Sequence, residues 1–382
     1  MQYRKFGKLD WKGSVLGFGI MRLPLTDDDP ANIDEPESIR MIRYAIDQGV
    51  NYVDTAYPYH SWQSEPLLGR ALLDGYREKV KLATKMSPWL IESSRDFDRY
   101  LNGQFGRLQT EKIDFYLLHG LNQESWSKLR KLGVLRWAEK AMADGRIGYL
   151  GFSFHDEFGV FKEIVDAYDN WTFCQIQYNY MDVDYQAGTR GLKYAADRGL
   201  AVVVMEPLRG GFLSKKIPEP VARIWAGAPS GRSPIELALQ WVWNHSEVSV
   251  VLSGMSTMEQ VIEDIAFANR SRPGTLTAEE LAVIDRVRET YRQLSPIPCT
   301  GCRYCLPCSN GVEIPRIFEF YNDAVMYDNT PRGQLFYSEL AEKQCADQCT
   351  ECGECVEACP QGIQIPELLQ KAHTLLVPKK QS

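Results

Sequence analysis

Eight short apolar runs recur along the first two thirds of the chain, and each is followed by a helix-like stretch. The runs span residues 15–18, 51–54, 80–84, 113–118, 147–152, 173–176, 201–204 and 248–252. The helix-like segments include 36–46 and 234–243, the second of which opens with Ser233 as a cap and Pro234 at the first helical position. Continuous apolar strands that alternate with helices indicate a parallel sheet buried on both faces. Eight such units in about 265 residues therefore predict a closed (β/α)8 barrel, an α/β fold.

The alternative architecture is a doubly wound open sheet, but no Gly-x-Gly-x-x-Gly motif follows the first strand. Residues 3–13 are interpreted as a hairpin that closes the bottom of the barrel. After about residue 291 the alternation of strands and helices ends. A proline-containing linker follows at 295–298, and a cysteine-rich stretch lies beyond it. We therefore expect a barrel over residues 1–292 and an iron-sulfur domain over residues 293–382.

Net charge and the distribution of apolar residues argue against a nucleic-acid-binding, secreted or membrane-spanning protein. The chain has 382 residues, 44% of them hydrophobic, and a net charge of -7, so no overall basic field attracts nucleic acid. No apolar run follows the N-terminal charges, and no stretch of about 18 apolar residues occurs, so neither a secretory signal nor a membrane span is expected. The sequence thus predicts a cytoplasmic protein.

The cysteines are distributed very unevenly. Of the ten, only Cys174 precedes residue 299. Two runs of four hold eight of the others: Cys299, Cys302, Cys305 and Cys308, then Cys349, Cys352, Cys355 and Cys359. The second run precedes Pro360 and has the bacterial ferredoxin spacing. Zinc is the alternative, since Cys-x2-Cys pairs also bind it, but runs of four favour iron-sulfur. Cys345 fits neither run, and Cys174 is interpreted as a core residue.

Four polar residues follow consecutive predicted strands. Asp54 ends the second strand with Tyr59 in the loop beyond it, Lys85 ends the third and His119 ends the fourth. Barrel active sites gather at the carboxyl ends of the strands, so these side chains should converge. Carbonyl reduction by hydride leaves an alkoxide that needs a proton. Tyr59 could donate that proton if Lys85 lowered its pKa, with Asp54 holding Lys85 and His119 orienting the substrate oxygen. The structural alternatives are a buried Asp54–Lys85 ion pair and a satisfied core histidine.

The motifs around these residues resemble those of a known family. Asp54-Thr55-Ala56-Tyr57-Pro58-Tyr59 looks like the second-strand signature of the aldo-keto reductases, and residues 83–85, 116–119 and 145–153 resemble its later landmarks. The resemblance covers about residues 1 to 290, and the cysteines match the branch with a C-terminal two-cluster [4Fe-4S] ferredoxin-type domain. It implies NAD(P)H-dependent reduction of a small carbonyl compound, or oxidation of an alcohol, with Tyr59 as acid/base.

The same resemblance implies a dinucleotide extended across the barrel mouth. The expected contacts are Ser153, Gln177, Met205, Leu208, Arg209, Gly210, Gly211, Leu213, Gly254, Ser256, Gln260, Glu263 and Asp264. Phe154, Met205 and Asp264 depart from the residues usual in the family, and no Lys or Arg lies between Ser253 and Arg270. The resemblance implies NADP(H) as the cofactor. A 2′-phosphate needs a positive partner, however, and the absence of one in this segment leaves NAD(H) possible. The alternative for residues 253–260 is an ordinary capped helix with a glycine turn.

By resemblance to two-cluster ferredoxins, three cysteines of one run bind one cubane and the fourth reaches the other. One cluster would take Cys299, Cys302, Cys305 and Cys359. The other would take Cys349, Cys352, Cys355 and Cys308. Similar phrases at 311–315 and 362–366 follow the two runs, and helix-like segments at 316–326 and 333–343 lie between them. A mostly helical version of the ferredoxin domain is expected.

A hydride carries two electrons and each cluster accepts one, so three functional hypotheses remain. The clusters could pass electrons between the barrel and an external ferredoxin or flavoprotein. They could instead be structural or redox-sensing, beside an ordinary reductase. In the third hypothesis the protein is an electron-transfer or redox-sensing subunit whose barrel has little reductase activity.

Overall fold

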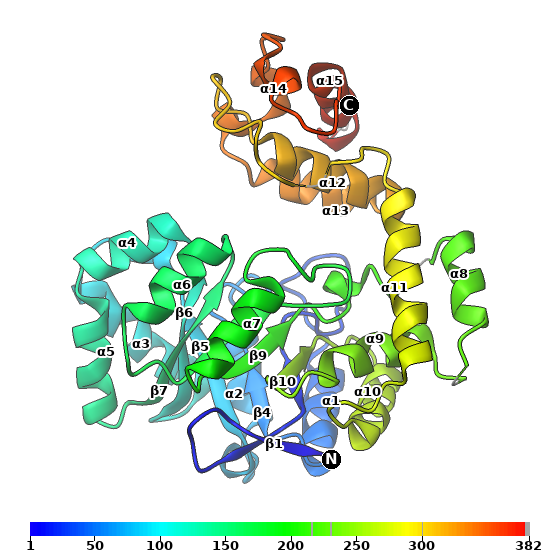
Figure 1. The fold of residues 1–382 in the computed structure, drawn as a ribbon. Coiled ribbons are helices and arrows are strands. Elements are labelled where there is room, and N and C mark those ends of the chain that lie inside the picture. Colours follow the sequence, from blue (N-terminus) through cyan, green and yellow to red (C-terminus); the bar gives the residue numbers. More distant parts are fainter. Residues whose placement is uncertain (215–216, 230, 300, 379–382) are drawn as a thin grey trace. The chain divides into compact units, whose positions relative to one another are not determined.

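The computed structural model describes residues 1–214, 217–229, 231–299 and 301–378 (Figure 1). By packing, the chain divides into two compact units. The first comprises Met1–Gly211 and Ser233–Thr277, and the second comprises Phe212–Arg232 and Ala278–Ser382. Each unit therefore combines segments that are apart in the sequence. The domain boundary expected between residues 292 and 293 stays a prediction.

The first unit is a closed barrel of eight parallel strands, joined in the order β10-β3-β4-β5-β6-β7-β8-β9. The strands are β3 (Leu16–Gly19), β4 (Tyr52–Asp54), β5 (Lys81–Met86), β6 (Ile113–Leu121), β7 (Ile147–Phe154), β8 (Phe173–Gln177), β9 (Ala201–Met205) and β10 (Val248–Ser253). Each strand overlaps one of the predicted apolar runs. The predicted (β/α)8 barrel is therefore confirmed, and the open-sheet alternative is wrong.

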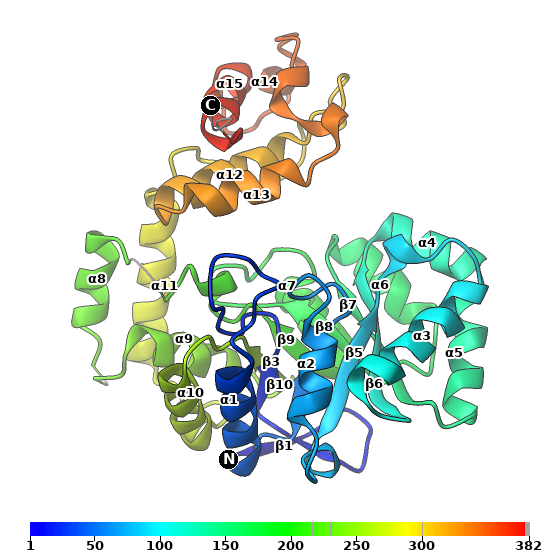
Figure 2. The same cartoon turned by 180° about the vertical axis from the view of Figure 1, so that it is seen from behind.

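Helices surround the strands of this unit (Figure 2). They are α1 (Glu35–Asp47), α2 (Ser64–Ala71), α3 (Arg95–Leu108), α4 (Gln123–Lys131), α5 (Val134–Ala143), α6 (Phe158–Asp166), α7 (Gly188–Asp197), α9 (Pro234–Trp243) and α10 (Met258–Arg270). Helix α9 begins as the sequence predicts: the Ser233 hydroxyl accepts a hydrogen bond from the Glu236 amide at 3.1 Å, and Pro234 occupies the first turn.

An N-terminal hairpin closes the bottom of the barrel, as expected. Its strands β1 (Tyr3–Lys5) and β2 (Lys12–Ser14) are antiparallel, and between them Phe6 is fully buried in the barrel interior. The Phe6 ring centroid lies 4.7 Å from that of Phe115. Gly7 has φ +56 and sits where a Cβ atom would lie 2.6 Å from the backbone of Ala201, so glycine is required at this position.

The alternation of side chains along each strand stacks a polar layer above the apolar interior. The interior consists of Phe6, Tyr52, Ala83, Phe115, Leu117, Phe173, Ala201, Val203, Val250 and Leu252. Two residues beyond Tyr52, Ala83 and Leu117, on the same side of their strands, come Asp54, Lys85 and His119. Strand pairing sets Lys85 opposite Leu117 and Gln177 opposite Met205. The strands therefore deliver the expected catalytic side chains to one end of the barrel.

The second unit is helical. It contains α8 (Glu219–Ala226), α11 (Ala278–Gln293), α12 (Ile314–Met326), α13 (Thr330–Ser338), α14 (Glu354–Glu357) and α15 (Ile365–Leu376), and its described residues include no strand. Helix α12 matches the predicted helix at 316–326. The helix predicted over 333–343 is misplaced: Asn329 caps α13 and Pro331 lies in its first turn, so this helix begins earlier and ends at Ser338.

The two similar phrases after the cysteine runs fold in the same way. Gly311 and Gly362 both have positive φ angles, +80 and +64. The apolar residue after each glycine is buried, and α12 and α15 then begin with an isoleucine followed by a proline. The residues that precede these helices have nearly equal backbone angles, φ -83 and ψ 64 against φ -76 and ψ 75. The sequence repeat is thus a structural repeat.

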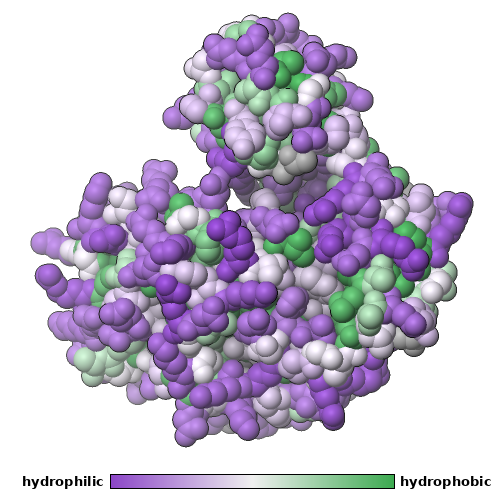
Figure 3. Space-filling view, in the orientation of Figure 1, coloured by the Kyte–Doolittle hydropathy of each residue, from purple (hydrophilic) through white to green (hydrophobic). Residues whose placement is uncertain are grey.

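Hydrophilic side chains dominate the face shown in Figure 3, with hydrophobic residues scattered among them. Among the described helices, none combines the length and the apolar character needed to cross a membrane.

Replacing Gly151 by alanine should destabilise the barrel. Gly151 lies on β7, and a Cβ atom there would sit 2.5 to 2.7 Å from three ring atoms of the buried Phe173. Overpacking of this kind costs about 1–3 kcal/mol of the free energy of unfolding. Gly159 on α6 is the control, because no described atom lies within 4 Å of its added Cβ. Gly159→Ala should be neutral or stabilising by up to about 1 kcal/mol in urea unfolding. Equal midpoints for both variants would contradict this view of the interior.

Candidate active site and cluster sites

A buried ion pair links β4 and β5 at the carboxyl ends of these strands. The Lys85 ammonium donates to Asp54 Oδ1 and, at 2.8 Å, to the Thr55 carbonyl oxygen. Both side chains are almost fully buried. Burial, the largest single effect, lowers the pKa of Lys85. The electrostatic interactions and hydrogen bonds with Asp54 and Tyr59 together outweigh it, so the pKa of Lys85 is raised and the ammonium keeps its charge.

Tyr59 lies beside this pair. The Lys85 ammonium is 5.0 Å from the Tyr59 ring centroid, and the ring of His119 meets that of Tyr59 edge-on with centroids 5.9 Å apart. The expected lowering of the tyrosine pKa is wrong in its net direction: burial raises the pKa of Tyr59 by more than Lys85 lowers it. The phenol is therefore protonated at neutral pH, which is the form that can donate a proton.

His119 is neutral. Burial, reinforced by the positive charge of Lys85, holds the pKa of His119 well below its usual value. Its Nδ1 atom is buried and has no hydrogen-bond partner among the described residues, in contrast to a satisfied core histidine. The ring of Trp89, which is 56% exposed, stands 5.2 Å from the imidazole ring. A neutral imidazole beside an exposed aromatic ring suits contact with an uncharged carbonyl group.

A buried network under β5, missed by the sequence reasoning, supports Lys85. Gln104 donates to the carboxylate of Glu65 at 2.7 Å and to the Lys85 carbonyl oxygen at 3.1 Å. Thr84 and Arg107 also donate to Glu65, each at 2.7 Å. These contacts hold the backbone of the strand that carries Lys85. Glu65 and Gln104 belong to helices α2 and α3, and no motif in their neighbourhood marks them.

On the expected nicotinamide side, Ser153, Gln177 and Met205 all share the lumen-facing side of their strands. The Ser153 hydroxyl accepts from the Gly120 amide at 2.7 Å. The Gln177 amide nitrogen donates to Asp182 at 2.8 Å. Phe154 has the opposite orientation and packs against Phe161, with ring centroids 5.1 Å apart. Phe154, one of the residues expected to depart from the family pattern, is therefore a core residue.

The loop after β9 holds Leu208, Arg209, Gly210 and Gly211. Arg209 Nε lies 3.3 Å from the Asp182 carboxylate, which ties this loop to Gln177. The amides of Arg209 and Gly211 donate within the turn, to Glu206 and Leu208 at 2.9 Å. These two amides are therefore engaged within the turn, and the contact expected between this loop and the dinucleotide stays a prediction. Leu213, another expected contact, is buried and belongs to the second unit.

The segment after β10 leads into the capped helix α10. The Ser256 amide donates to the Gln260 side chain at 2.8 Å, and Thr257 caps α10. Gly254, Gln260 and Glu263 are exposed.

Asp264 points inward and accepts from the Ser253 hydroxyl at 2.6 Å. Burial raises the pKa of Asp264 to about 6. The Asp264 carboxylate is therefore buried against Ser253, whereas the other expected contacts on this segment, Gly254, Gln260 and Glu263, are exposed.

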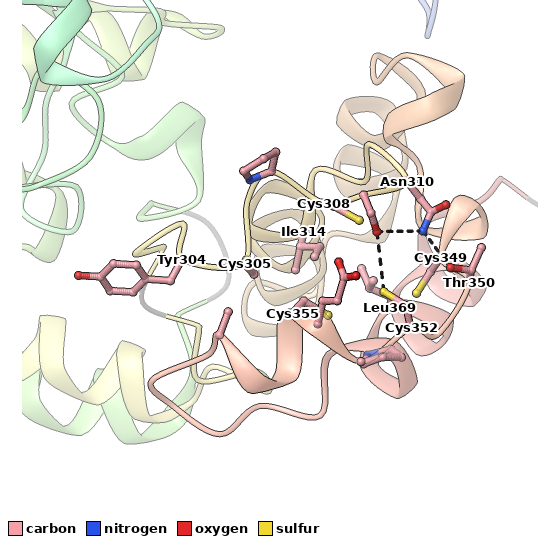
Figure 4. Close-up of a pocket in the computed structure, with 16 residues that line it drawn as sticks. Tyr304, Cys305, Cys308, Asn310, Ile314, Cys349, Thr350, Cys352, Cys355 and Leu369 are labelled. Atoms are coloured by element: carbon pink, nitrogen blue, oxygen red, sulfur yellow. Dashed lines mark hydrogen bonds between the residues drawn. The ribbon is translucent and has the colours of Figure 1, made fainter.

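The eight expected cluster cysteines line two cavities in the second unit. A cavity of about 160 Å3 is bordered by Cys308, Cys349, Cys352 and Cys355 (Figure 4). A smaller one, about 20 Å3, is bordered by Cys299, Cys302 and Cys359. Cys305 lines both. Each cavity thus draws cysteines from both runs, in the grouping on which the expected ligand assignment depends; the assignment itself stays a prediction.

The two cysteine loops have matching backbone shapes. Gly301 and Glu351, each two residues after the first cysteine of its run, have φ +69 and +57. Arg303 and Gly353, each directly after the second cysteine, have φ +64 and +84. Residues with left-handed backbone conformation at equivalent positions give both loops the same curvature around their cavities.

Side-chain contacts join the two runs. The Asn310 amide donates to the Thr350 hydroxyl at 2.8 Å, and Ser309 Oγ lies 3.9 Å from the Cys352 sulfur atom (Figure 4). The loop after the first run is thereby tied to the second run beside the larger cavity.

Among the described residues, no group of three or more His, Cys, Asp or Glu side chains is placed to hold a single metal ion. A [4Fe-4S] cubane binds one cysteine at each iron atom, so its ligands need not meet at one point. Burial raises the pKa of Cys305 to about 11, with neighbouring Cys299 acting in the same direction, so loading the site would release protons. Cys345 is not among the described residues that line either cavity.

A closed parallel barrel with a Tyr-Lys-Asp-His group at the carboxyl ends of its strands is the architecture of a barrel oxidoreductase. The model of the Aldo/keto reductase family matches residues 15–289, and that of the 4Fe-4S dicluster domain matches residues 298–363. The chain belongs to the aldo/keto reductase family and carries a C-terminal 4Fe-4S dicluster domain. It is therefore an oxidoreductase, and its cysteine-rich domain is of an iron-sulfur type.

Individual relatives agree with this assignment. The chain is similar to the uncharacterized oxidoreductase YrpG of Bacillus subtilis, with 27% identity over 239 residues that cover 56% of this chain and 69% of the relative. It is also similar to L-galactose dehydrogenase of Arabidopsis thaliana, with 24% identity covering 77% of this chain and 97% of the relative. Among solved structures, an aldo-keto reductase from Bacillus halodurans in its holo form is 28% identical with a TM-score of 0.63, covering 75% of this chain and 96% of that one.

Asp264→Asn should stabilise the protein above pH 6. A carboxyl group whose pKa is about 6 in the folded state and lower when unfolded binds its proton more tightly when folded, so stability falls as pH rises from about 4 to 6. Asparagine removes this loss, worth up to about 3 kcal/mol at pH 7.5, and has none to remove at pH 4. Thermal unfolding across this pH range measures the difference between variant and wild type. Glu263→Gln, at the exposed neighbouring position, should change stability by less than about 0.5 kcal/mol; a comparable gain there would refute the assignment to Asp264.

Proposed function

We propose that the barrel reduces a carbonyl compound with a nicotinamide dinucleotide, with Tyr59 as acid/base, and that the C-terminal clusters carry electrons. The observation that supports the reductase most directly is the convergence of Asp54, Lys85, Tyr59 and His119 at one end of the barrel. These side chains come from three strands and a loop, and their grouping serves no evident purpose in packing.

Each residue has a distinct role. A bound reduced nicotinamide would supply a hydride to the carbonyl carbon. Tyr59 donates its phenolic proton to the carbonyl oxygen, so that an alcohol forms and a phenolate remains. The Lys85 ammonium stabilises that phenolate, and Asp54 keeps Lys85 charged and in place. Neutral His119 contacts the carbonyl oxygen and orients it, and solvent returns the proton to Tyr59 afterwards.

The residues around the mouth suit a dinucleotide. Ser153 and Gln177 offer a hydroxyl and an amide on the lumen side for the carboxamide group, and the buried Gln175 Oε1 has no hydrogen-bond partner among the described residues. Arg209 brings a positive charge near Gln177 through Asp182. We propose NADP(H) as the cofactor, with NAD(H) as the alternative because the helix after β10 offers no cation before Arg270.

For the clusters, we propose the assignment in which each binds three cysteines of one run and one of the other. The two cavities support it, because Cys359 borders the cavity of the first run and Cys308 that of the second. Cys305 borders both cavities and would therefore lie between the two clusters. The smaller cavity must widen to accept a cluster of equal size.

Tyr59→Phe should abolish carbonyl-dependent oxidation of the reduced dinucleotide, lowering kcat by roughly 10²- to 10⁴-fold while leaving dinucleotide binding in place. Tyr57→Phe is the matched control, because Tyr57 lies on the same loop but packs against Tyr100 and Arg107. Its rate should stay within about threefold of wild type. Absorbance at 340 nm under anoxic conditions measures both. A rate for Tyr59→Phe equal to that of the wild type would refute the role of Tyr59 as the proton donor.

Iron content should separate the two cluster sites. The wild type should hold about eight iron atoms, and Cys359→Ala about four. Adding Cys302→Ala should cost no further iron, because both residues would serve one cluster, whereas adding Cys352→Ala should remove nearly all of it. Cys345→Ala should retain the full content. Complete loss in the Cys302/Cys359 double variant would instead mean that each run binds its own cluster.

Electron transfer is tested by a one-electron dye. With reduced dinucleotide present and no carbonyl compound, the wild type should reduce the dye, and the Cys352/Cys359 double alanine variant should not. Carbonyl reduction should persist in that variant. Dye reduction at the wild-type rate without clusters would remove the electron-transfer role and leave them structural or redox-sensing.

A further inference from the structure

The segment between β3 and α1 brings Arg22 to the mouth of the barrel. Three contacts place the segment: the Ile20 amide donates to the Asp54 carbonyl at 2.8 Å, the Leu23 amide to His60 Nε2 at 3.2 Å, and the Ser256 hydroxyl to the Arg22 carbonyl at 2.7 Å. Arg22 is therefore fixed between the end of β4, which carries Asp54, and the end of β10.

The side chain of Arg22 extends over Gly254. A Cβ atom added at Gly254 would lie 3.2 Å from Cγ and from Cδ of Arg22, so the absence of a side chain there makes room for the arginine stem. The guanidinium is close enough to the active site for its positive charge to lower the pKa of Tyr59, against the larger effect of burial. Arg22 itself is half-buried.

Of the cations near the active site, Arg22 differs in having no counterion. Lys85 is bonded to Asp54 and to a carbonyl oxygen, and Arg209 is paired with Asp182. The Arg22 guanidinium has no hydrogen bond or ion pair with any described residue. A guanidinium without a counterion can bind an anion, preferably a planar carboxylate held by two hydrogen bonds.

We propose that Arg22 binds a carboxylate of the substrate, so that the reductase acts on oxo acids in preference to uncharged carbonyl compounds. The inference depends on the proposed reductase activity. The substrate would place its carbonyl oxygen between Tyr59 and His119 and its carboxylate on Arg22, while the exposed ring of Trp89, 5.2 Å from His119, would form an apolar wall. The backbone contacts that fix the Arg22 segment beside Asp54 and His60, at the reacting end of the barrel, favour a substrate anion over a cofactor phosphate.

The test compares two aldehydes that differ in charge and by one methyl group, 3-carboxybenzaldehyde and its methyl ester, with reduced dinucleotide in the full-length, cluster-loaded protein. The wild type should show a kcat/KM at least roughly tenfold higher for the acid, as expected of a charge-assisted contact. Arg22→Gln should lower the acid-to-ester ratio by tenfold or more, chiefly through KM for the acid. Arg22→Lys should restore part of the ratio, because it keeps the charge but loses the two-pronged geometry.

Dinucleotide affinity, measured by fluorescence quenching, distinguishes a substrate carboxylate from a cofactor phosphate as the anion that Arg22 binds. Binding of the dinucleotide also shows that the variant is folded. A Kd within about twofold of wild type in Arg22→Gln, together with the fall in the ratio, supports the proposal. Equal wild-type kcat/KM for acid and ester overturns it. So does a weaker Kd with both aldehydes equally impaired, which would assign Arg22 to the cofactor phosphates. If the wild type reduces neither aldehyde, the proposed reductase function fails and this assignment falls with it.

Discussion

The buried contact between the Lys85 ammonium and the Asp54 carboxylate is the interaction on which the active site depends. Two charges in a nearly dry interior are tolerated only as a pair, and removal of one partner from such a pair typically costs about 3–5 kcal/mol. Further contacts offset the cost of burying the intact pair. Lys85 also donates to the Thr55 carbonyl oxygen, and the network of Gln104 and Glu65 holds the backbone of the strand that carries Lys85. The pair therefore both stabilises the polar layer and keeps a positive charge beside Tyr59.

Much of the barrel could be predicted because its signals are local. Apolar runs of strand length mark every strand, and a strand's end tells where a side chain such as Asp54 or His119 must lie once the sheet closes. The pKa of Tyr59 could not be obtained in this way. Its neighbour Lys85 was identified correctly, but the degree of burial depends on the loops that cover the ring, and burial proved the larger effect. Asp264 is a similar case, because only the folded helix shows that its carboxylate turns toward Ser253.

The cysteine-rich unit was open to prediction for a different reason. The spacing of its cysteines and its repeated Gly-x-x-Ile-Pro motif are short-range patterns in the sequence. In the structure, the two copies of the motif have similar backbone angles as well as similar residues. The length of α13 was misjudged, since a cap at Asn329 and a proline in the first turn outweigh the periodicity that suggested a later helix. Arg22 was overlooked because nothing in its sequence neighbourhood distinguishes it; its isolation from counterions exists only in three dimensions.

The larger cavity is walled by both cysteine runs, which lie on either side of the segment that contains α12 and α13. Under the proposed ligand assignment, neither run is a complete binding site by itself. A nascent chain that has exposed only the first run would then offer three of the four ligands of one cluster. Cluster insertion on this chain would therefore have to follow synthesis of the second run.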